Sequence, residues 1–260
     1  MNKWIIACIA SASFSNFVYA ETEQNKGLEI AKEVERRDQG WGDATTKLKM
    51  ILRNRQGEES GRNIRLKILE VKSDGDKSQT IFDNPADVKG TAFLSYSHTT
   101  KPDDQWLYLP ALKRIKRISS SNKSGPFMGS QFAFEDLASF EVDKYTYKYL
   151  RDEVLQGTDS FIVEMYPQYE FSGYKRQIVW IDKQRYIPLK VEYYDRKNEL
   201  LKTLTFKTYK QYLNHYWRAH QQVMENHQSG KSTLLVLNDY KFHVGLKEKD
   251  FNRNSLKRIR

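Results

Sequence analysis

The sequence predicts a mainly β protein with some α structure: a curved antiparallel sheet of about eleven strands wrapped around a few helices. Two observations carry this prediction. From residue 45 onward, runs rich in Tyr, Val, Ile, Thr and Phe are separated by short groups of turn-forming residues, which is typical of strands joined by tight turns. Near the start of the chain, by contrast, apolar residues recur at helical spacing.

The first twenty residues have the three parts of a secretory signal peptide. Lys3 precedes an apolar run at residues 4–12, and small residues then lead to a cleavage site after Ala20. An apolar run this short does not span a bilayer, which takes about 20 apolar residues. We therefore expect residues 1–20 to be a cleaved signal peptide and the mature chain to be periplasmic.

Cleavage would remove Cys8, the only cysteine of the chain. Only seven residues precede it, too few for the basic and apolar parts of a lipoprotein signal, so we do not expect it to be lipidated. Without disulfides, residues 21–260 must rely on a hydrophobic core. A chain of that length buries roughly 70% of its unfolded surface, and we expect it to form a single domain.

The expected elements begin with a helix at residues 21–43. Leu28, Ala31 and Val34 recur at helical spacing between charged residues, and a Gly-Trp-Gly sequence ends the pattern. Strand patterns dominate from there on. Five strands are expected in the first half, at residues 45–55, 63–71, 77–82, 91–96 and 105–109.

The second half predicts six longer strands and one short helix. Within residues 200–208, Leu200, Leu204 and Phe206 fall on one face and threonines on the other, so one face should be dry and the other wet. The short helix is expected near residues 134–139. The six strands are expected at residues 160–166, 176–181, 186–194, 200–212, 216–226 and 232–242.

The chain is basic, with 43 Lys and Arg against 33 Asp and Glu. In the cytoplasm such a surplus would suggest nucleic acid as a partner. Outside the inner membrane the abundant anions are lipid head groups, which attract a cationic surface at roughly 1 kcal/mol per nearby Lys or Arg. We expect no nucleic-acid partner. A basic surface that serves only solubility remains the alternative.

No motif for catalysis, metal or cofactor binding is found. His215 and His220 are the closest histidine pair, and on one strand they would point to opposite faces. Residues 230–233, Gly-Lys-Ser-Thr, imitate a phosphate-binding loop, but they join two expected strands and are better interpreted as a hairpin turn. We therefore expect no enzyme, metal or cofactor; a hydrolase with an unfamiliar site is a weaker alternative.

Several segments resemble the outer-membrane lipoprotein-sorting protein family, a branch of the LolA-like periplasmic carriers. The central ones are DQWLYLPALKRI at residues 104–115, SGPFMGS at 124–130 and FEDL at 134–137. FDNPADVKG at 82–90 precedes them, and VWID at 179–182 and PLK at 188–190 follow. The resemblance extends over most of the mature chain.

The resemblance implies a LolA/LolB-like half-open barrel, with helices forming a lid over an apolar cavity that receives acyl chains. The expected cargo is a lipoprotein or a lipid, handed from an inner-membrane transporter to an outer-membrane acceptor by a carrier that we expect to be monomeric. No metal, nucleotide or catalytic residue comes with the family. The alternative is an envelope interaction module that holds no ligand, or an accessory subunit of a lipid exporter of the resistance-nodulation-division (RND) type.

The segment at residues 119–130 is the candidate lid. Its composition is typical of a loop, yet four large apolar side chains follow within eight positions, and a solvated loop gains nothing from them. We expect Gly125 and Gly129 to act as hinges. In the alternative interpretation the apolar side chains are simply core. The candidate ligand and lid residues are Phe127, Met128, Phe132, Phe134, Trp106 and Tyr108.

A basic cluster directly follows the strand expected at 105–109. It consists of Lys113, Arg114, Lys116 and Arg117. Alternation would place these charges on both faces of a strand, which a sheet packed on one side cannot accept, so we infer a hairpin near a rim. The cations could meet anionic head groups or an acidic partner protein there. Plain solvated charge is the alternative.

Overall fold

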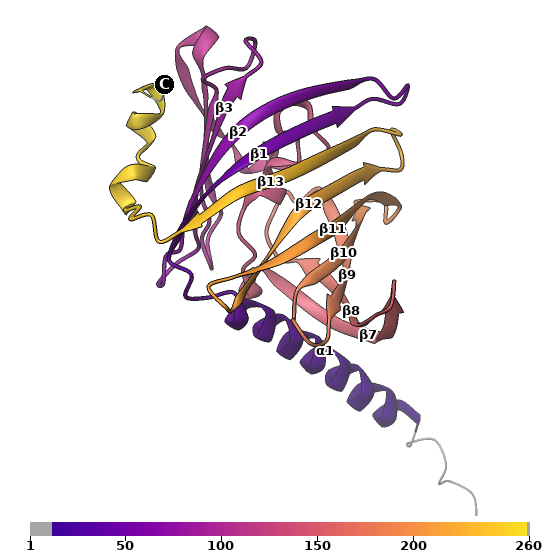
Figure 1. Cartoon of the computed structure of the whole chain (residues 1–260). Coiled ribbons are helices and arrows are strands. Elements are labelled where there is room, and N and C mark those ends of the chain that lie inside the picture. Colours follow the sequence, from indigo (N-terminus) through magenta and orange to yellow (C-terminus); the bar gives the residue numbers. More distant parts are fainter. Residues whose placement is uncertain (1–11, 259–260) are drawn as a thin grey trace, which may run out of the picture.

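The computed structural model describes residues 12–258. One helix, α1 (Ala12–Arg37), precedes a single antiparallel sheet of 13 strands (Figure 1). The strands are β1 (Asp43–Arg53), β2 (Glu59–Leu69), β3 (Lys77–Asn84), β4 (Ala92–Tyr96), β5 (Asp104–Leu109), β6 (Arg114–Ile118), β7 (Tyr145–Leu155), β8 (Thr158–Pro167), β9 (Tyr174–Asp182), β10 (Pro188–Asp195), β11 (Leu200–Tyr212), β12 (Tyr216–Asn226) and β13 (Ser232–Phe242).

The order of strands makes the sheet an open half-barrel. It runs β6-β5-β4-β3-β2-β1-β13-β12-β11-β10-β9-β8-β7, so β1 and β13 join the two halves of the chain (Figure 1). Strands β6 and β7 are consecutive in the sequence but form the two opposite edges of the sheet. The sheet does not close into a barrel, and the predicted fold class is confirmed.

All eleven expected strands are present, with ends shifted by a few residues. The two that the sequence did not predict are the edge strands β6 and β7.

Helix α1 ends at Arg37, before Gly40 and Gly42 turn the chain with φ values of +98° and +76°. Residues 12–20, the end of the expected signal peptide, form the first part of α1. Residues 1–11 lie outside the described part of the chain. Cleavage of the signal peptide therefore stays a prediction.

Strand β1 shows why the sheet has a dry concave face. Its even-numbered residues from Ala44 to Met50 are buried, whereas Lys47 and Lys49 are exposed. Side chains of a strand alternate between its two faces, so this pattern turns one face inward. Strands β2 and β13 pair along β1 on either side and extend the same inner face.

Helix α1 lies against the edge strand β7 (Figure 1). Ile30 and Ala31 of this helix are buried in the larger hydrophobic cluster. Gly27, one turn earlier, is also buried, and a Cβ atom at this position would lie 2.8 Å from the backbone nitrogen of Tyr149. The glycine therefore allows the helix axis to come close to the strand.

The connection between β6 and β7, residues 119–144, has to cross from one edge of the half-barrel to the other. It does so as a series of 3-10 turns rather than a helix, and the helix expected near residues 134–139 is one of them. These turns are Ser120–Asn122, Phe127–Gly129, Phe134–Leu137 and Val142–Lys144; further 3-10 segments are Pro110–Leu112, Glu248–Phe251 and Arg253–Arg258.

Two hydrophobic clusters hold the fold. The larger one lies on the concave side, where residues of the sheet, α1 and residues 119–144 pack together. The smaller one lies on the outer face of β3, β4 and β5, where the C-terminal segment covers it with Phe251 and Leu256, both fully buried. Among the described residues, no helix is long and apolar enough to cross a membrane.

Candidate functional site

The concave side of the half-barrel contains a cavity of about 2000 Å³. Its walls come from α1, from the inner faces of most strands and from the connection between β6 and β7. The wall is largely aliphatic and aromatic because alternate residues of each strand face inward. Examples from strands far apart in the sheet are Leu48, Met50, Val163, Met165, Val179, Val191, Leu235 and Leu237.

Two of the predicted lid residues, Phe127 and Phe132, line this cavity. Both are nearly completely buried, with 1% and 3% of their surface exposed, and both belong to the larger hydrophobic cluster. The ring centroid of Phe127 lies 5.1 Å from that of Phe93 and 5.5 Å from that of Phe134. The candidate lid segment, despite its loop-like composition, therefore packs Phe127 inward together with the nearby Phe132. These side chains belong both to the hydrophobic core and to the wall of the cavity.

The other two predicted lid residues lie behind this wall. Met128 and Phe134 are partly buried against the cluster but do not line the cavity. Met128 has a φ of +50°, and its carbonyl accepts a hydrogen bond from the guanidinium of Arg62. Of the predicted hinges, Gly129 has a φ of +77°, a conformation that glycine adopts without strain, and Gly125 lies within a turn.

A buried ion pair ties the connection to the inner face of the sheet. The Nζ atom of Lys202 on β11 lies 2.6 Å from Oδ2 of Asp136, and each side chain is 4% exposed. Asp136 also accepts hydrogen bonds from the Tyr174 hydroxyl (2.7 Å) and from the backbone N–H of Ala133 (2.6 Å). Lys202 donates a second hydrogen bond to the carbonyl of Gln131. These bonds hold the 3-10 turn at Phe134–Leu137 in place.

Sequence reasoning missed this pair, although the signal was present. Lys202 lies two residues before Leu204, so the alternation that turns this leucine inward turns the lysine inward too. An inward lysine requires a buried carboxylate as partner, because an unpaired buried charge costs several kcal/mol.

Glu135, next to Asp136, fixes the same turn to the loop before β9. Its carboxylate accepts hydrogen bonds from Tyr169, Ser172 and the backbone N–H of Gly173, at 3.1, 2.9 and 2.8 Å. Burial, and then the charge of Asp136, raises the pKa of Glu135. Glu135 and Asp136 therefore anchor the connection to the second half of the sheet.

Trp106 and Tyr108 do not lie at the cavity, and the expectation that they do needs correction. Both side chains are on the outer face of β5, in the cluster covered by the C-terminal segment. The rings of Trp106 and Tyr96 meet edge to face, with 5.1 Å between their centroids. The inner face of β5 carries Gln105 and Leu107 instead, both buried.

The basic cluster lies on the rim hairpin that the sequence indicated, formed by β5 and β6. Lys113 forms the turn, with a φ of +48°. Arg114, Lys116 and Arg117 are exposed along the edge strand, and Arg117 forms an ion pair with Asp104 at 2.6 Å. Charged side chains on an edge strand also prevent pairing with other sheets.

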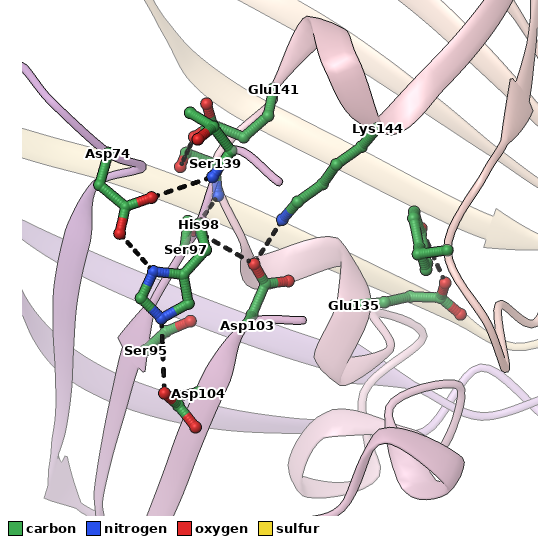
Figure 2. Close-up of polar contacts among 12 residues, drawn as sticks. Asp74, Ser95, Ser97, His98, Asp103, Asp104, Glu135, Ser139, Glu141 and Lys144 are labelled. Atoms are coloured by element: carbon green, nitrogen blue, oxygen red, sulfur yellow. Dashed lines mark hydrogen bonds and ion pairs between the residues drawn. The ribbon is translucent and has the colours of Figure 1, made fainter. Parts of the chain in front are cut away.

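A polar network at one end of the cavity links three loops (Figure 2). The ring of His98 lies between two carboxylates, with Nδ1 at 2.5 Å from Asp74 and Nε2 at 3.4 Å from Asp104. The Ser97 hydroxyl accepts a hydrogen bond from the backbone of Ser139 (2.8 Å). Since both ring nitrogens face carboxylates and the nearby serine is bound to backbone, the histidine does not activate a nucleophile in this arrangement.

Acidic residues dominate the same end of the cavity. Burial is the largest cause that raises the pKa of Asp76 to about 7, and the negative charges of Glu141 and Glu70 add to it. Burial also raises the pKa of Glu141, whose carboxylate accepts a hydrogen bond from Ser139. Among residues 12–258, no cluster of three or more His, Cys, Asp or Glu side chains could hold a metal ion.

Comparison with known proteins identifies the family. A family profile described only as an "uncharacterized protein" matches residues 74–258. The solved structure of a proposed outer-membrane lipoprotein-sorting protein domain from Vibrio parahaemolyticus shares 62% identity with this chain, over 90% of this chain and 99% of that one, with a TM-score of 0.89. The chain belongs to the outer-membrane lipoprotein-sorting protein family.

Two more distant structures have the same fold. A DUF1329 family protein from Desulfovibrio piger is 30% identical, with a TM-score of 0.85 and coverage of 90% of this chain and 99% of that one. A LolA superfamily protein from Nitrosomonas europaea, at 21% identity, shares the fold with a TM-score of 0.70 and coverage of 88% and 98%. A comparison with curated protein sequences gave no match.

Proposed function

We propose that this member of the LolA-like family is a periplasmic carrier that shields acyl chains of a lipoprotein or a lipid on their way to the outer membrane. The observation that carries the proposal is the apolar cavity of about 2000 Å³. It is larger than the roughly 300–1,000 Å³ of ordinary small-molecule sites. Each methylene removed from water contributes about 0.8 kcal/mol, so an apolar hollow binds acyl chains without directional chemistry.

Three further features support a carrier in the periplasm. The N-terminal sequence has the composition of an exported chain, cleaved after Ala20. Family membership suggests the compartment and the class of cargo. The half-barrel leaves its cavity open at one side for cargo to enter. We expect residues 21–260 to act as one monomeric domain that receives cargo from an inner-membrane transporter and delivers it to an outer-membrane acceptor.

The connection between β6 and β7 is the proposed lid. Phe127 and Phe132 would contact the acyl chain directly, since they already form part of the wall. Met128 and Phe134 would support them from behind, and Gly125 and Gly129 would let the segment swing. Lid movement has to separate the connection from β11 and β13, to which it is bound through Lys202 and Thr233.

A disulfide lock tests the lid. The backbone N–H of Gln131 donates to the Thr233 hydroxyl at 2.9 Å, and the mature chain would contain no cysteine, so the pair Gln131→Cys and Thr233→Cys can be oxidised selectively. We expect the oxidised form to exchange a bound acyl probe at least tenfold more slowly than the same protein after reduction. Equal exchange in both forms would remove the lid from the mechanism.

The basic edge strand is the proposed contact for anionic head groups or an acidic partner. Lys113, Arg114, Lys116 and Arg117 are displayed together at the rim hairpin. Changing all four to Gln should weaken binding to anionic vesicles and reduce its dependence on salt. Unchanged binding that is insensitive to salt would show that these cations serve only to protect the edge.

Purification from the periplasm tests the carrier function itself. Native mass spectrometry and lipid extraction should find acyl species bound to the wild-type protein. If the protein is consistently free of acyl species and binds no added acyl probe, the carrier proposal fails. An envelope interaction module, or an accessory subunit of an RND-type exporter, would then be the better account.

A further inference from the structure

One part of the cavity wall contains three arginines, each in an ion pair with a carboxylate. Arg37 ends α1, Arg185 lies in the turn between β9 and β10, and Arg218 lies on β12; all three line the cavity. Their side chains remain 35%, 32% and 18% exposed. The cavity therefore opens to solvent where three segments far apart in the sequence bring guanidinium groups together.

Each guanidinium group lies over an aromatic ring. The distances from the guanidinium carbon to the ring centroid are 4.1 Å for Arg37 over Tyr186, 5.2 Å for Arg185 over Trp217 and 5.7 Å for Arg218 over Trp41. Stacking on a ring leaves the N–H edges of a guanidinium free to bind in its plane.

Each arginine also keeps N–H donors that no described residue uses. Arg218 donates through Nη1 only, to Asp38 and to the carbonyl of Trp217. Arg185 binds Asp182 through Nε and Nη2, which leaves Nη1. Arg37 uses Nε and Nη1 and keeps Nη2. Together the three arginines can still offer hydrogen bonds to an anion.

Two of the carboxylates at this end are already bound to backbone. Asp182 accepts the N–H groups of Gln184 and Arg185, at 2.8 and 2.9 Å. Glu70 accepts those of Gly40 and Gly42, at 2.6 and 2.7 Å. These acids shape the loops around the opening, so their oxygens are partly occupied, whereas the arginines retain free donors.

We propose that this arginine mouth, Arg37, Arg185 and Arg218, binds the phosphate or another anionic oxygen group in the head of an amphiphile whose acyl chain fills the cavity. This inference rests on the proposed carrier function and adds the class of cargo and its orientation. Arginine suits oxyanions because its planar N–H groups match their oxygens.

The test compares two amphiphiles with one acyl chain of equal length: a lysophosphatidic acid and an uncharged monoacylglycerol. The double variant Arg37→Gln and Arg218→Gln leaves the pair of Arg185 with Asp182 intact. We expect it to bind the lysophosphatidic acid at least tenfold more weakly than the wild type and the monoacylglycerol within a factor of two. The control, Lys49→Gln with Lys207→Gln, loses the same charge at exposed positions that do not line the cavity and should bind both like the wild type.

The outcomes separate this inference from the carrier function. If the wild type binds neither amphiphile, the carrier function fails. If it binds both and the arginine variant weakens neither, only the arginine mouth is wrong. Inorganic phosphate alone, bound as tightly as the lysophosphatidic acid, would overturn the assignment to a lipid head group.

A measurement on the wild-type protein covers the case in which the variant does not fold. Raising the salt concentration from 0.1 to 0.5 M should weaken binding of the lysophosphatidic acid and leave the monoacylglycerol unaffected, because only the first gains from ionic contacts. Equal salt dependence for the two amphiphiles would contradict the inference.

Discussion

Lys202 and Asp136 form an ion pair inside the half-barrel, with 2.6 Å between Nζ and Oδ2 and each side chain 4% exposed. The lysine belongs to β11, an interior strand of the sheet, and the aspartate to the connection that spans the two edges of the sheet. The pair therefore joins two parts of the fold that share no strand pairing. It also places a charge next to the apolar cavity, where an unpaired charge is costly.

Removing the lysine should strongly destabilise the protein. In Lys202→Met the carboxylate of Asp136 stays buried without its cation, and such losses cost about 3–5 kcal/mol. Urea unfolding measures the free energy directly. The exposed pair of Lys47 with Asp239, whose side chains are 72% and 56% exposed, provides the control: Lys47→Met should cost less than about 1 kcal/mol. Equal effects of the two changes would contradict a structural role for the buried pair.

Gly27→Ala should destabilise the contact between α1 and β7. Alanine favours a helix interior by about 1 kcal/mol over glycine. Here its Cβ would lie 2.8 Å from the Tyr149 nitrogen, and forcing backbone apart costs typically 1–3 kcal/mol. We expect the cost of the clash to exceed the gain in helix propensity, so the melting temperature of the variant should fall. A higher melting temperature in the variant would show that the helix does not come this close to β7.

Phe127 and Met128 are neighbours but should respond differently to truncation. Phe127→Ala empties a site that is 99% buried among aromatic rings and should cost about 3–5 kcal/mol of unfolding free energy. Met128→Ala removes a partly buried side chain outside the cavity and should cost less than about 1.5 kcal/mol. Chemical denaturation of the two variants checks this order, and similar losses would show that both side chains are core.

Stability should depend on pH through Asp76. The pKa of this group is raised to about 7 in the folded protein from its usual 3.8, so the folded state binds the proton more tightly than the unfolded state. This contribution is present at about pH 4 and is lost as the pH rises through 7. Asp76→Asn should therefore match the wild type near pH 4 and be more stable at pH 8, by about 1–2 kcal/mol after allowance for solvent screening. Parallel profiles of unfolding free energy against pH would refute the shift.

The strands of the second half were predictable because their local signals are strong. From β8 to β13, runs of β-branched and aromatic residues end at turn residues such as Asn198 and Gly230, which have φ values of +67° and +69°. The edge strands were harder. Strand β6 has charges on both faces, which only an edge position permits, and β7 mixes tyrosines with exposed charged residues.

The direction in which β5 faces could not be predicted from its own residues. Alternation separates Trp106 and Tyr108 from Gln105 and Leu107, and the aromatic face is the more apolar of the two. The C-terminal segment, about 140 residues further along the chain, decides the outcome because Phe251 covers the aromatic face from outside. The alternation of residues within β5 does not indicate a contact with a segment so distant in the sequence.

The central claim is that acyl chains enter the concave cavity, and paramagnetic broadening by a spin-labelled fatty acid tests it most directly. With methyl-labelled protein, the account predicts broadening of Leu48, Val191 and Leu235, which line the cavity from strands across the sheet. The methyl signals of Ile81 and Leu94, in the outer cluster, should stay sharp. Broadening confined to the outer cluster, or none at a concentration above that of the protein, would contradict the claim.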